Sequence, residues 1–296
     1  MRALMCIPNI SEGIRLDVVE QVVEAIRTVA GIRLLKVSSD ADHNRTVLSY
    51  LGAPDAVLEA TRHMAQRAFE LIDMSQHSGS HPRLGAVDVV PFVPVRGVNM
   101  DEAVEISRAF GHFVGEMGIP VYYYERSATC PGRQSLPAIR KGEYEGLAEK
   151  LADPEGQPDE GPAVFSPRSG AVVTGARFPL VAFNVNLCTT DLSLAKRIAR
   201  AVRHISGGYR YVRAMGVELG DKGLVQVSMN VTNYEKTPLP RILETVRAEA
   251  ARYGVNVAGT ELIGAVPLGV LEQVTRHYLQ SHDLESGQIV EMSLLE

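Results

Sequence analysis

The order of strand-like and helix-like segments occurs twice along the chain, and this repetition constrains the fold more than any other feature. Each time, an apolar run precedes a helical stretch, then two strand-like runs, a second helical stretch and a last strand-like run. In a ferredoxin-like unit this order places both helices on one face of a four-stranded sheet. We therefore predict an α+β protein with two ferredoxin-like βαββαβ subdomains and a cleft between them.

The first predicted unit has a strand over 2–8, a helix over 16–29, strands over 32–37 and 45–51, a long helix from Pro54, and a strand over 87–95. Pro91 and Pro94 cannot donate hydrogen bonds to a neighbouring strand. We therefore expect the last strand to be irregular, or to lie at a sheet edge, for part of its length.

The second predicted unit has a strand over 180–187, a helix over 192–205, strands over 209–219 and 224–231, a helix over 238–253, and a strand over 255–263. Between the units we expect a helix over 99–117, a short strand over 121–124 and an irregular, proline-rich tract over 153–170. The predicted subdomains are residues 1–178 and 179–296.

Composition excludes several classes of function. With a formal net charge of -5, the chain lacks the basic excess that nucleic-acid binding requires. No signal peptide or membrane span is recognisable, so we expect a cytoplasmic protein without a membrane partner. The three cysteines have neither disulfide nor metal-ligand spacing.

The strongest candidate for chemistry is the Gly-rich loop from His77 to Asp88, which combines two imidazoles, a guanidinium and a carboxylate before a strand. A solvated or structural histidine would also explain this pattern. Histidines four apart on a helix can share zinc, but Gly79 and Pro82 argue against a helix between His77 and His81. We therefore expect no metal.

A second polar cluster, residues 40–45, lies at the tip of the first predicted hairpin. Turn chemistry alone would explain its Asp and Asn residues. In a βαββαβ unit, however, the end of strand 1, the hairpin tip and the start of strand 4 lie at one end of the sheet. Asn9, Asp42 and His81 would then lie close together.

A third candidate is the Gly/Pro-rich loop from Gly161 to Gly170, in which Phe165 offers an aromatic face and Arg168 can bind a carboxylate. This pattern alone is nonspecific. The chain has no P-loop, no G-x-S-x-G elbow and no strand-bound G-x-G-x-x-G, so these motifs give no support to ATP hydrolysis, α/β-hydrolase chemistry or Rossmann redox chemistry.

Several motifs, taken together and in order, resemble the formiminotransferase family. They are residues 6–13 (Cys-Ile-Pro-Asn-Ile-Ser-Glu-Gly), 44–47 (Asn-Arg-Thr-Val), His81-Pro82-Arg83 with Gly85, Ala86 and Asp88, residues 136–140 (Leu-Pro-Ala-Ile-Arg), 142–145 (Gly-Glu-Tyr-Glu), 161–170, 174–177 (Thr-Gly-Ala-Arg) and 182–186 (Ala-Phe-Asn-Val-Asn). The resemblance therefore extends from the N-terminus into the second predicted unit.

The resemblance implies a dimeric enzyme of two subdomains that moves a formimino group between N-formimino-L-glutamate and tetrahydrofolate, its co-substrate. Such a reaction belongs to one-carbon metabolism and histidine degradation. The expected partners are these small molecules and a second copy of the chain. Some members also carry a C-terminal cyclodeaminase domain, for which 296 residues leave no room, so we expect transfer without cyclisation.

The resemblance also implies roles for particular residues. The histidine of the family's His-Pro-Arg motif is the catalytic acid/base and corresponds to His81. The proposed substrate-binding residues are Asn9, Asp40, Asn44, Arg45 and Arg83. The segment that resembles the folate-binding loop comprises Gly161, Pro162, Ala163, Val164, Phe165, Ser166, Pro167, Arg168, Ser169 and Gly170.

One departure from the family pattern concerns the carboxylate that would assist His81. Relatives place an Asp directly after the second strand, where this chain has Ser38, which leaves Asp40 or Asp42 for that role. Two alternative functions stay open at this point. One is formyl transfer between glutamate and folate, and the other is folate binding without catalysis.

Overall fold

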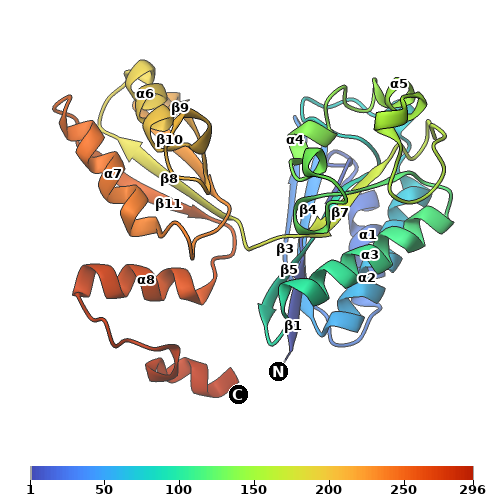
Figure 1. The fold of residues 1–296 in the computed structure, drawn as a ribbon, viewed down its shortest axis with the longest axis horizontal. Coiled ribbons are helices and arrows are strands. Elements are labelled where there is room, and N and C mark those ends of the chain that lie inside the picture. Colours follow the sequence, from blue (N-terminus) through green and yellow to red (C-terminus); the bar gives the residue numbers. More distant parts are fainter. Residues whose placement is uncertain (1, 296) are drawn as a thin grey trace. The chain divides into compact units, whose positions relative to one another are not determined.

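The computed structural model describes residues 2–295, and the chain divides into two compact units, one ending at Arg177 and the other beginning at Phe178 (Figure 1). Each unit has its own sheet and its own hydrophobic core. The predicted α+β class is therefore confirmed. The cleft between the units stays a prediction.

The sheet of the first unit has the spatial order β3, β4, β1 with β2, β5, β7 and β6. Its strands are β1 (Ala3–Cys6), β2 (Asn9–Ile10), β3 (Arg33–Asp40), β4 (Arg45–Gly52), β5 (Val87–Arg96), β6 (Val121–Tyr123) and β7 (Val172–Ala176). Both β1 and β2 pair with β4 and β5, so they are two parts of one strand, interrupted at Ile7 and Pro8. This part of the sheet is antiparallel and has the predicted order of elements.

Strands β6 and β7 extend this sheet with parallel pairings, β7 to β5 and β6 to β7. Strand β7 was not predicted, because its partner in the sheet is remote in sequence and local patterns do not report such pairing. Since β7 pairs with β5 only from Val89 to Phe92, the part of β5 that contains Pro94 is a sheet edge, as expected. Pro91 lies within the paired part.

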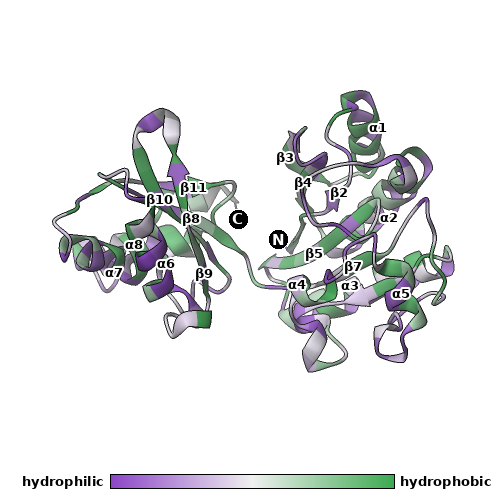
Figure 2. Ribbon diagram, turned by 90° about the horizontal axis from the view of Figure 1, so that it is seen from above, coloured by the Kyte–Doolittle hydropathy of each residue, from purple (hydrophilic) through white to green (hydrophobic). Residues whose placement is uncertain are grey.

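Three helices cover one face of the first sheet: α1 (Leu16–Arg27), α2 (Pro54–Leu71) and α3 (Met100–Glu116). Helix α1 buries Val18, Val19, Val22, Val23 and Ile26, which lie on one side of it because of their helical spacing. Full burial of each such side chain contributes about 1.5–3 kcal/mol. Figure 2 shows strand β5, on which the core is built, as mostly hydrophobic.

The segment between β6 and β7 covers the opposite face of β5, β6 and β7. It contains two short helices, α4 (Leu136–Ile139) and α5 (Leu147–Ala152), that the sequence did not predict. Its apolar residues form a second cluster with the sheet, made of Leu84, Val89, Tyr122, Tyr124, Ile139, Leu147, Leu151, Ala171 and Val173. The tract from 153 to 170 is irregular, as expected, apart from a short 3-10 turn.

The second unit has the antiparallel sheet order β11, β8, β10, β9. Its elements follow the predicted βαββαβ order: β8 (Val181–Leu187), α6 (Leu192–Val202), β9 (Val212–Leu219), β10 (Leu224–Val231), α7 (Leu239–Ala251) and β11 (Val257–Ile263). Helices α6 and α7 cover one face and complete the core. A further helix, α8 (Leu268–Leu279), packs against α7 and was not predicted.

Candidate active site

The loop before β5 packs against the tip of the β3–β4 hairpin. The backbone N–H and the hydroxyl of Ser80 donate to the carbonyl of Asp42 at 3.2 and 3.1 Å. A Cβ on Gly79 would lie 2.4 Å from the carbonyl oxygen of His43, so only glycine permits this approach. The structure thus brings the hairpin tip and the His81 loop together, as the predicted topology required.

Asn44 joins three segments at this end of the sheet. It has a left-handed backbone conformation, with φ of 45°, which Asn tolerates better than most residues. Its side chain accepts a hydrogen bond from the N–H of Gly13 and donates one to the carbonyl of Ser78, both at 2.9 Å. The predicted substrate ligand Asn44 therefore holds the site together.

His81 lies half-buried with a defined tautomer. Its Nδ1 is 2.7 Å from the carbonyl oxygen of Pro82. Because a carbonyl can only accept, Nδ1 must carry the hydrogen, and the lone pair of the neutral ring lies on Nε2. The ring also contacts His43 edge to face, with centroids 5.7 Å apart.

Asp88 is the extra residue of a β-bulge, because consecutive residues Asn9 and Ile10 pair with Val89 and Val87 of β5. Bulges near active sites redirect a side chain out of the regular alternation. The Asp88 side chain is fully buried, and its Oδ1 accepts from the N–H of Leu84 at 2.9 Å.

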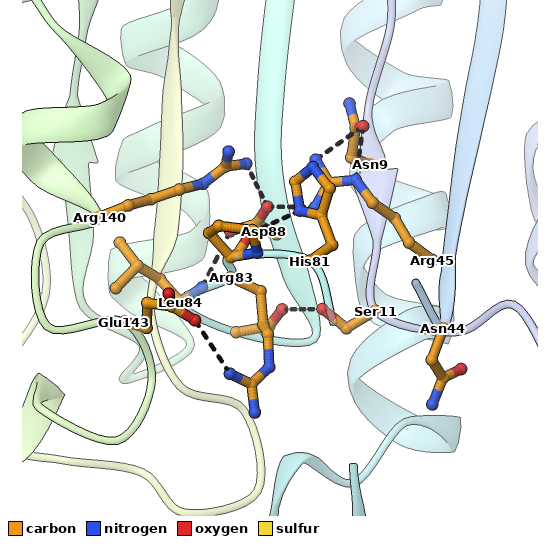
Figure 3. Close-up of polar contacts among 12 residues, drawn as sticks. Asn9, Ser11, Asn44, Arg45, His81, Arg83, Leu84, Asp88, Arg140 and Glu143 are labelled. Carbon is orange, nitrogen blue, oxygen red and sulfur yellow. Dashed lines mark hydrogen bonds and ion pairs between the residues drawn. The ribbon is translucent and has the colours of Figure 1, made fainter. Parts of the chain in front are cut away.

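Two guanidiniums share the single carboxylate of Asp88 (Figure 3). Arg45 Nη1 lies 2.6 Å from Asp88 Oδ2, and Arg140 Nη2 bonds the same oxygen. Arg45 also donates from Nε and Nη2 to the side-chain oxygen of Asn9 at 3.0 and 2.8 Å. These four side chains form a buried cluster with a net charge of about +1, because two cations face one anion.

This charge affects His81. Partial burial and the positive charge of Arg45 lower the pKa of the imidazole below its ordinary value of 6.5, with a smaller contribution from Arg140. The hydrogen bond to the Pro82 carbonyl raises the pKa by less than burial or Arg45 lowers it, and Asp88 has the smallest effect in the same raising direction. At neutral pH the ring is therefore mainly uncharged, and its Nε2 can accept a proton.

His77 and Arg83 form a separate, fully paired group. His77 Nε2 donates to the carbonyl of Asn44 at 3.0 Å, and its Nδ1 accepts from Arg83 Nε at 3.3 Å. The Arg83 guanidinium pairs with both oxygens of Glu145 at 2.9 and 2.6 Å and approaches Glu143 at 3.4 Å. A substrate carboxylate at Arg83 would have to replace Glu145.

Asp40 contacts His43 rather than His81. Its Oδ1 accepts from the backbone N–H of His43 at 2.8 Å and lies 3.0 Å from the ring Nδ1. Among the described residues, no carboxylate is hydrogen-bonded to His81, whose Nδ1 is held by the Pro82 carbonyl instead. Asp40 is therefore linked to His81 only through the His43 ring.

The loop from Gly161 to Gly170 lies beside the His81 loop. Its last residues are fixed by backbone contacts, because Ala86 donates to the carbonyl of Ser169 at 2.9 Å. Gly85 approaches so closely that a Cβ there would lie 2.4 Å from the same oxygen. Most of the loop's other residues are exposed, including Val164 at 65%.

The two side chains predicted to contact folate have partners within the first unit. Phe165 packs against Tyr144, with ring centroids 5.4 Å apart. Arg168 Nη2 donates to the carbonyl of Glu70 at 2.6 Å, near the end of α2, where helical carbonyls lack partners within the helix. Arg168 also lies 4.0 Å from Asp73.

The structure therefore gathers His81, Asn9, Asn44 and Arg45 at one end of the sheet and adds two residues to which the sequence assigned no role. Asp88 was recognisable only as part of a motif, because its burial depends on the bulge. Arg140 follows α4 in an irregular segment, so no periodic pattern could place it beside Asp88.

Metal ligation would require at least three suitable side chains close together. Within residues 2–295, no three His, Cys, Asp or Glu side chains are so arranged. Both ring nitrogens of His77 already have hydrogen-bond partners, so His77 cannot join His81 around an ion without losing them. In the same part of the chain, no helix is both long and apolar enough to cross a membrane.

Comparison with known proteins gives matches over nearly the whole chain. Residues 3–177 match the formiminotransferase domain, N-terminal subdomain, and residues 182–294 match the formiminotransferase domain. A glutamate formimidoyltransferase of Streptococcus pyogenes is 46% identical over 98% of both chains. One from Thermoplasma acidophilum is 42% identical over 99% of this chain and 98% of its own.

A longer relative is the formimidoyltransferase-cyclodeaminase of Sus scrofa, which is 44% identical over 94% of this chain and 53% of its own length. These matches place the chain among the transferase enzymes built from two such subdomains. The resemblance seen in the motifs is confirmed: the chain belongs to the formiminotransferase family.

Proposed function

We propose that this enzyme transfers the formimino group between N-formimino-L-glutamate and tetrahydrofolate, giving 5-formiminotetrahydrofolate and L-glutamate, with His81 as the acid/base. The names of its relatives support the substrates. The observation that supports the role of His81 is its tautomer, which leaves the Nε2 lone pair unused beside a cationic cluster.

In the proposed reaction, N5 of tetrahydrofolate attacks the amidine carbon of the donor, and its proton passes to His81 Nε2. The resulting tetrahedral intermediate expels the nitrogen of glutamate as the C–N bond breaks. The imidazolium returns the proton to that nitrogen, so glutamate leaves as an amine. A single neutral imidazole thus serves both proton transfers.

The hydrogen bond from Nδ1 to Pro82 supports this role because it orients the ring and fixes which nitrogen reacts. Arg45 binds the buried Asp88 and is itself held by Asn9, and Asn44 fastens the segment before His81. We propose that these residues preorganise the site and that Arg83, through Glu145, positions the segment after α4.

We further propose that folate binds along the loop from Gly161 to Gly170, where the Phe165 and Tyr144 rings offer an aromatic surface. We propose that the enzyme is a cytoplasmic homodimer of subdomains 1–178 and 179–296 that acts in histidine degradation and needs no metal. Sedimentation of the purified chain would test the dimer, and assay after dialysis against a chelator would test the metal.

An assay of the purified chain with tetrahydrofolate tests the function. Formiminoglutamate and formylglutamate should be compared as donors under identical conditions, with direct measurement of tetrahydrofolate binding. Turnover of formiminoglutamate at least 100-fold faster than of formylglutamate is expected. Preference for formylglutamate would establish formyl transfer instead, and folate binding without turnover of either donor would identify a non-catalytic folate-binding protein.

A further inference from the structure

Arg140 has hydrogen-bonding capacity that the protein does not use. Its side chain is only 11% exposed, yet its Nε has no hydrogen-bond partner among the described residues. A buried donor without a partner costs about 1–3 kcal/mol, so native proteins rarely keep one without a reason. The two other such atoms in the described chain, Arg62 Nε and Gln273 Oε1, lie on helices α2 and α8.

Arg45 and Arg140 differ in this respect although both bind Asp88. Arg45 uses Nε, Nη1 and Nη2, which bond Asn9 and Asp88. Among the described residues, Arg140 makes one side-chain hydrogen bond, from Nη2 to Asp88. Within this cluster, the excess positive charge is therefore accompanied by a donor without a partner at Arg140.

The surroundings of Arg140 favour an anion close to the reacting atoms. Arg140 bonds the same carboxylate oxygen as Arg45 and is near enough to His81 to act on its charge (Figure 3). A carboxylate can accept from two N–H groups of one guanidinium, and such paired contacts are short and directional. In formiminoglutamate, the α-carboxylate is attached to the carbon that bears the reacting nitrogen.

We infer that Arg140 binds the α-carboxylate of the glutamate portion of the donor and so determines specificity for it. This inference rests on the proposed function. In this role Arg140 holds glutamate while Asp88 holds Arg140. His81 then acts on a nitrogen whose position is fixed by the neighbouring carboxylate.

The test compares Arg140→Gln and Arg140→Lys with the parent enzyme, using Arg62→Gln as the matched control. Arg62 also has a buried Nε without a partner, but it lies on α2 and faces Glu59 and Phe113. The donors are formiminoglutamate and its α-carboxamide analogue, which keeps the γ-carboxylate. Binding of L-glutamate and of its α-carboxamide, isoglutamine, is measured by calorimetry as a readout independent of turnover.

For Arg140→Gln we expect KM for formiminoglutamate to rise about 10- to 100-fold while kcat changes less than about fivefold. The reason is that the lost contact to the α-carboxylate would be equally strong in the bound substrate and in the transition state. The parent should prefer the α-carboxylate over the α-carboxamide by a similar factor, and Arg140→Gln should lose that preference. Arg140→Lys should recover part of the affinity, because lysine keeps the charge but loses the paired geometry. Arg62→Gln should match the parent.

Two results would overturn the inference. If Arg140→Gln folds and its KM rises by the same factor for both donors, Arg140 only positions Asp88. If KM and glutamate affinity stay unchanged, the unpartnered Nε of Arg140 has no part in binding the donor. Failure of the proposed function can be distinguished from failure of this inference alone, because the parent enzyme itself would then not use formiminoglutamate. In that case the inference would fail as well.

Discussion

The Nδ1 atom of His81 lies 2.7 Å from the carbonyl oxygen of Pro82, the next residue in the chain. A backbone carbonyl therefore occupies the orienting position that a carboxylate holds beside many catalytic histidines. The tautomer of His81 is therefore defined without a carboxylate, and Ser38 offers none.

Replacement of His81 by Asn should lower kcat by about two to four orders of magnitude, because the general acid/base is lost, with little effect on tetrahydrofolate affinity. His77→Asn is the matched control, since both its ring nitrogens serve structural hydrogen bonds. That control should lose stability but keep kcat within about tenfold. Near-normal turnover by a folded His81→Asn variant would reject the assignment.

The activity of the enzyme should decrease as the pH is lowered into the acid range. Since the pKa of His81 is lowered below 6.5, the neutral, active imidazole persists above that pKa and is lost as pH falls through it. The acid limb of log kcat/KM should thus lie below pH 6.5.

Arg140→Gln removes a positive charge near His81, so the pKa of the imidazole should rise and the acid limb should move to higher pH. Arg45 and Asp88, the other charges near the ring, stay in place. Arg67→Gln, on the exposed surface of α2, should not move the limb. A limb that stays fixed or moves to lower pH in Arg140→Gln would contradict this expectation.

Replacement of Asp88 by Asn should destabilise the first unit by about 3–5 kcal/mol, because the buried guanidiniums of Arg45 and Arg140 lose their counter-charge. Urea unfolding measures the loss. Glu70→Gln breaks the exposed ion pair with Arg67 and should cost less than about 1 kcal/mol. Equal losses in the two variants would show that the Asp88 cluster contributes no more than a surface pair.

Phe165→Ala should weaken tetrahydrofolate binding about tenfold, which corresponds to the loss of one aromatic contact. Arg168→Ala should also weaken binding if the loop holds folate, and both variants should melt within a few degrees of the parent. Val164→Ala, in the same loop and 65% exposed, is the control. If both Phe165→Ala and Arg168→Ala fold and bind as tightly as the parent, the loop is only a connection.

Gly85→Ala should destabilise the protein by about 1–3 kcal/mol, because the added Cβ would lie 2.4 Å from the carbonyl oxygen of Ser169 and 2.5 Å from that of Ala171. Thermal unfolding and tetrahydrofolate affinity should decline together as the two loops separate. Gly132→Ala has open space around its Cβ and should be nearly neutral. Normal stability in Gly85→Ala would show that the loops can separate without cost.

Local sequence patterns predicted the antiparallel parts of the fold well. The periodicity of Val18, Val19, Val22, Val23 and Ile26 is a local property, and it identified α1 to within two residues of its end. Strand β7 was missed because its five residues become a strand only through pairing with β5, which is distant in sequence. Helix α8, which follows the last predicted strand, was also missed.

The site was predictable only where topology determines proximity. The order of elements placed Asn9, the hairpin tip and His81 at one end of the sheet, and the contacts of Ser80 with Asp42 agree. The orientation of Asp88 depends on one extra residue in β5, and that of Arg140 on the irregular segment after α4. Neither follows from periodicity, because both are consequences of how distant segments pack.

The parallel pairing of β5 with β7 closes the stretch from 97 to 171 into one loop. The antiparallel pairing of β1 with β5 joins residues about as far apart in sequence, so the first sheet depends on two long-range closures. Such closure costs chain entropy and slows the contacts that depend on it. Arg140 and the loop from Gly161 to Gly170 both lie between β5 and β7, so their positions beside Asp88 and the His81 loop depend on the pairing of these two strands.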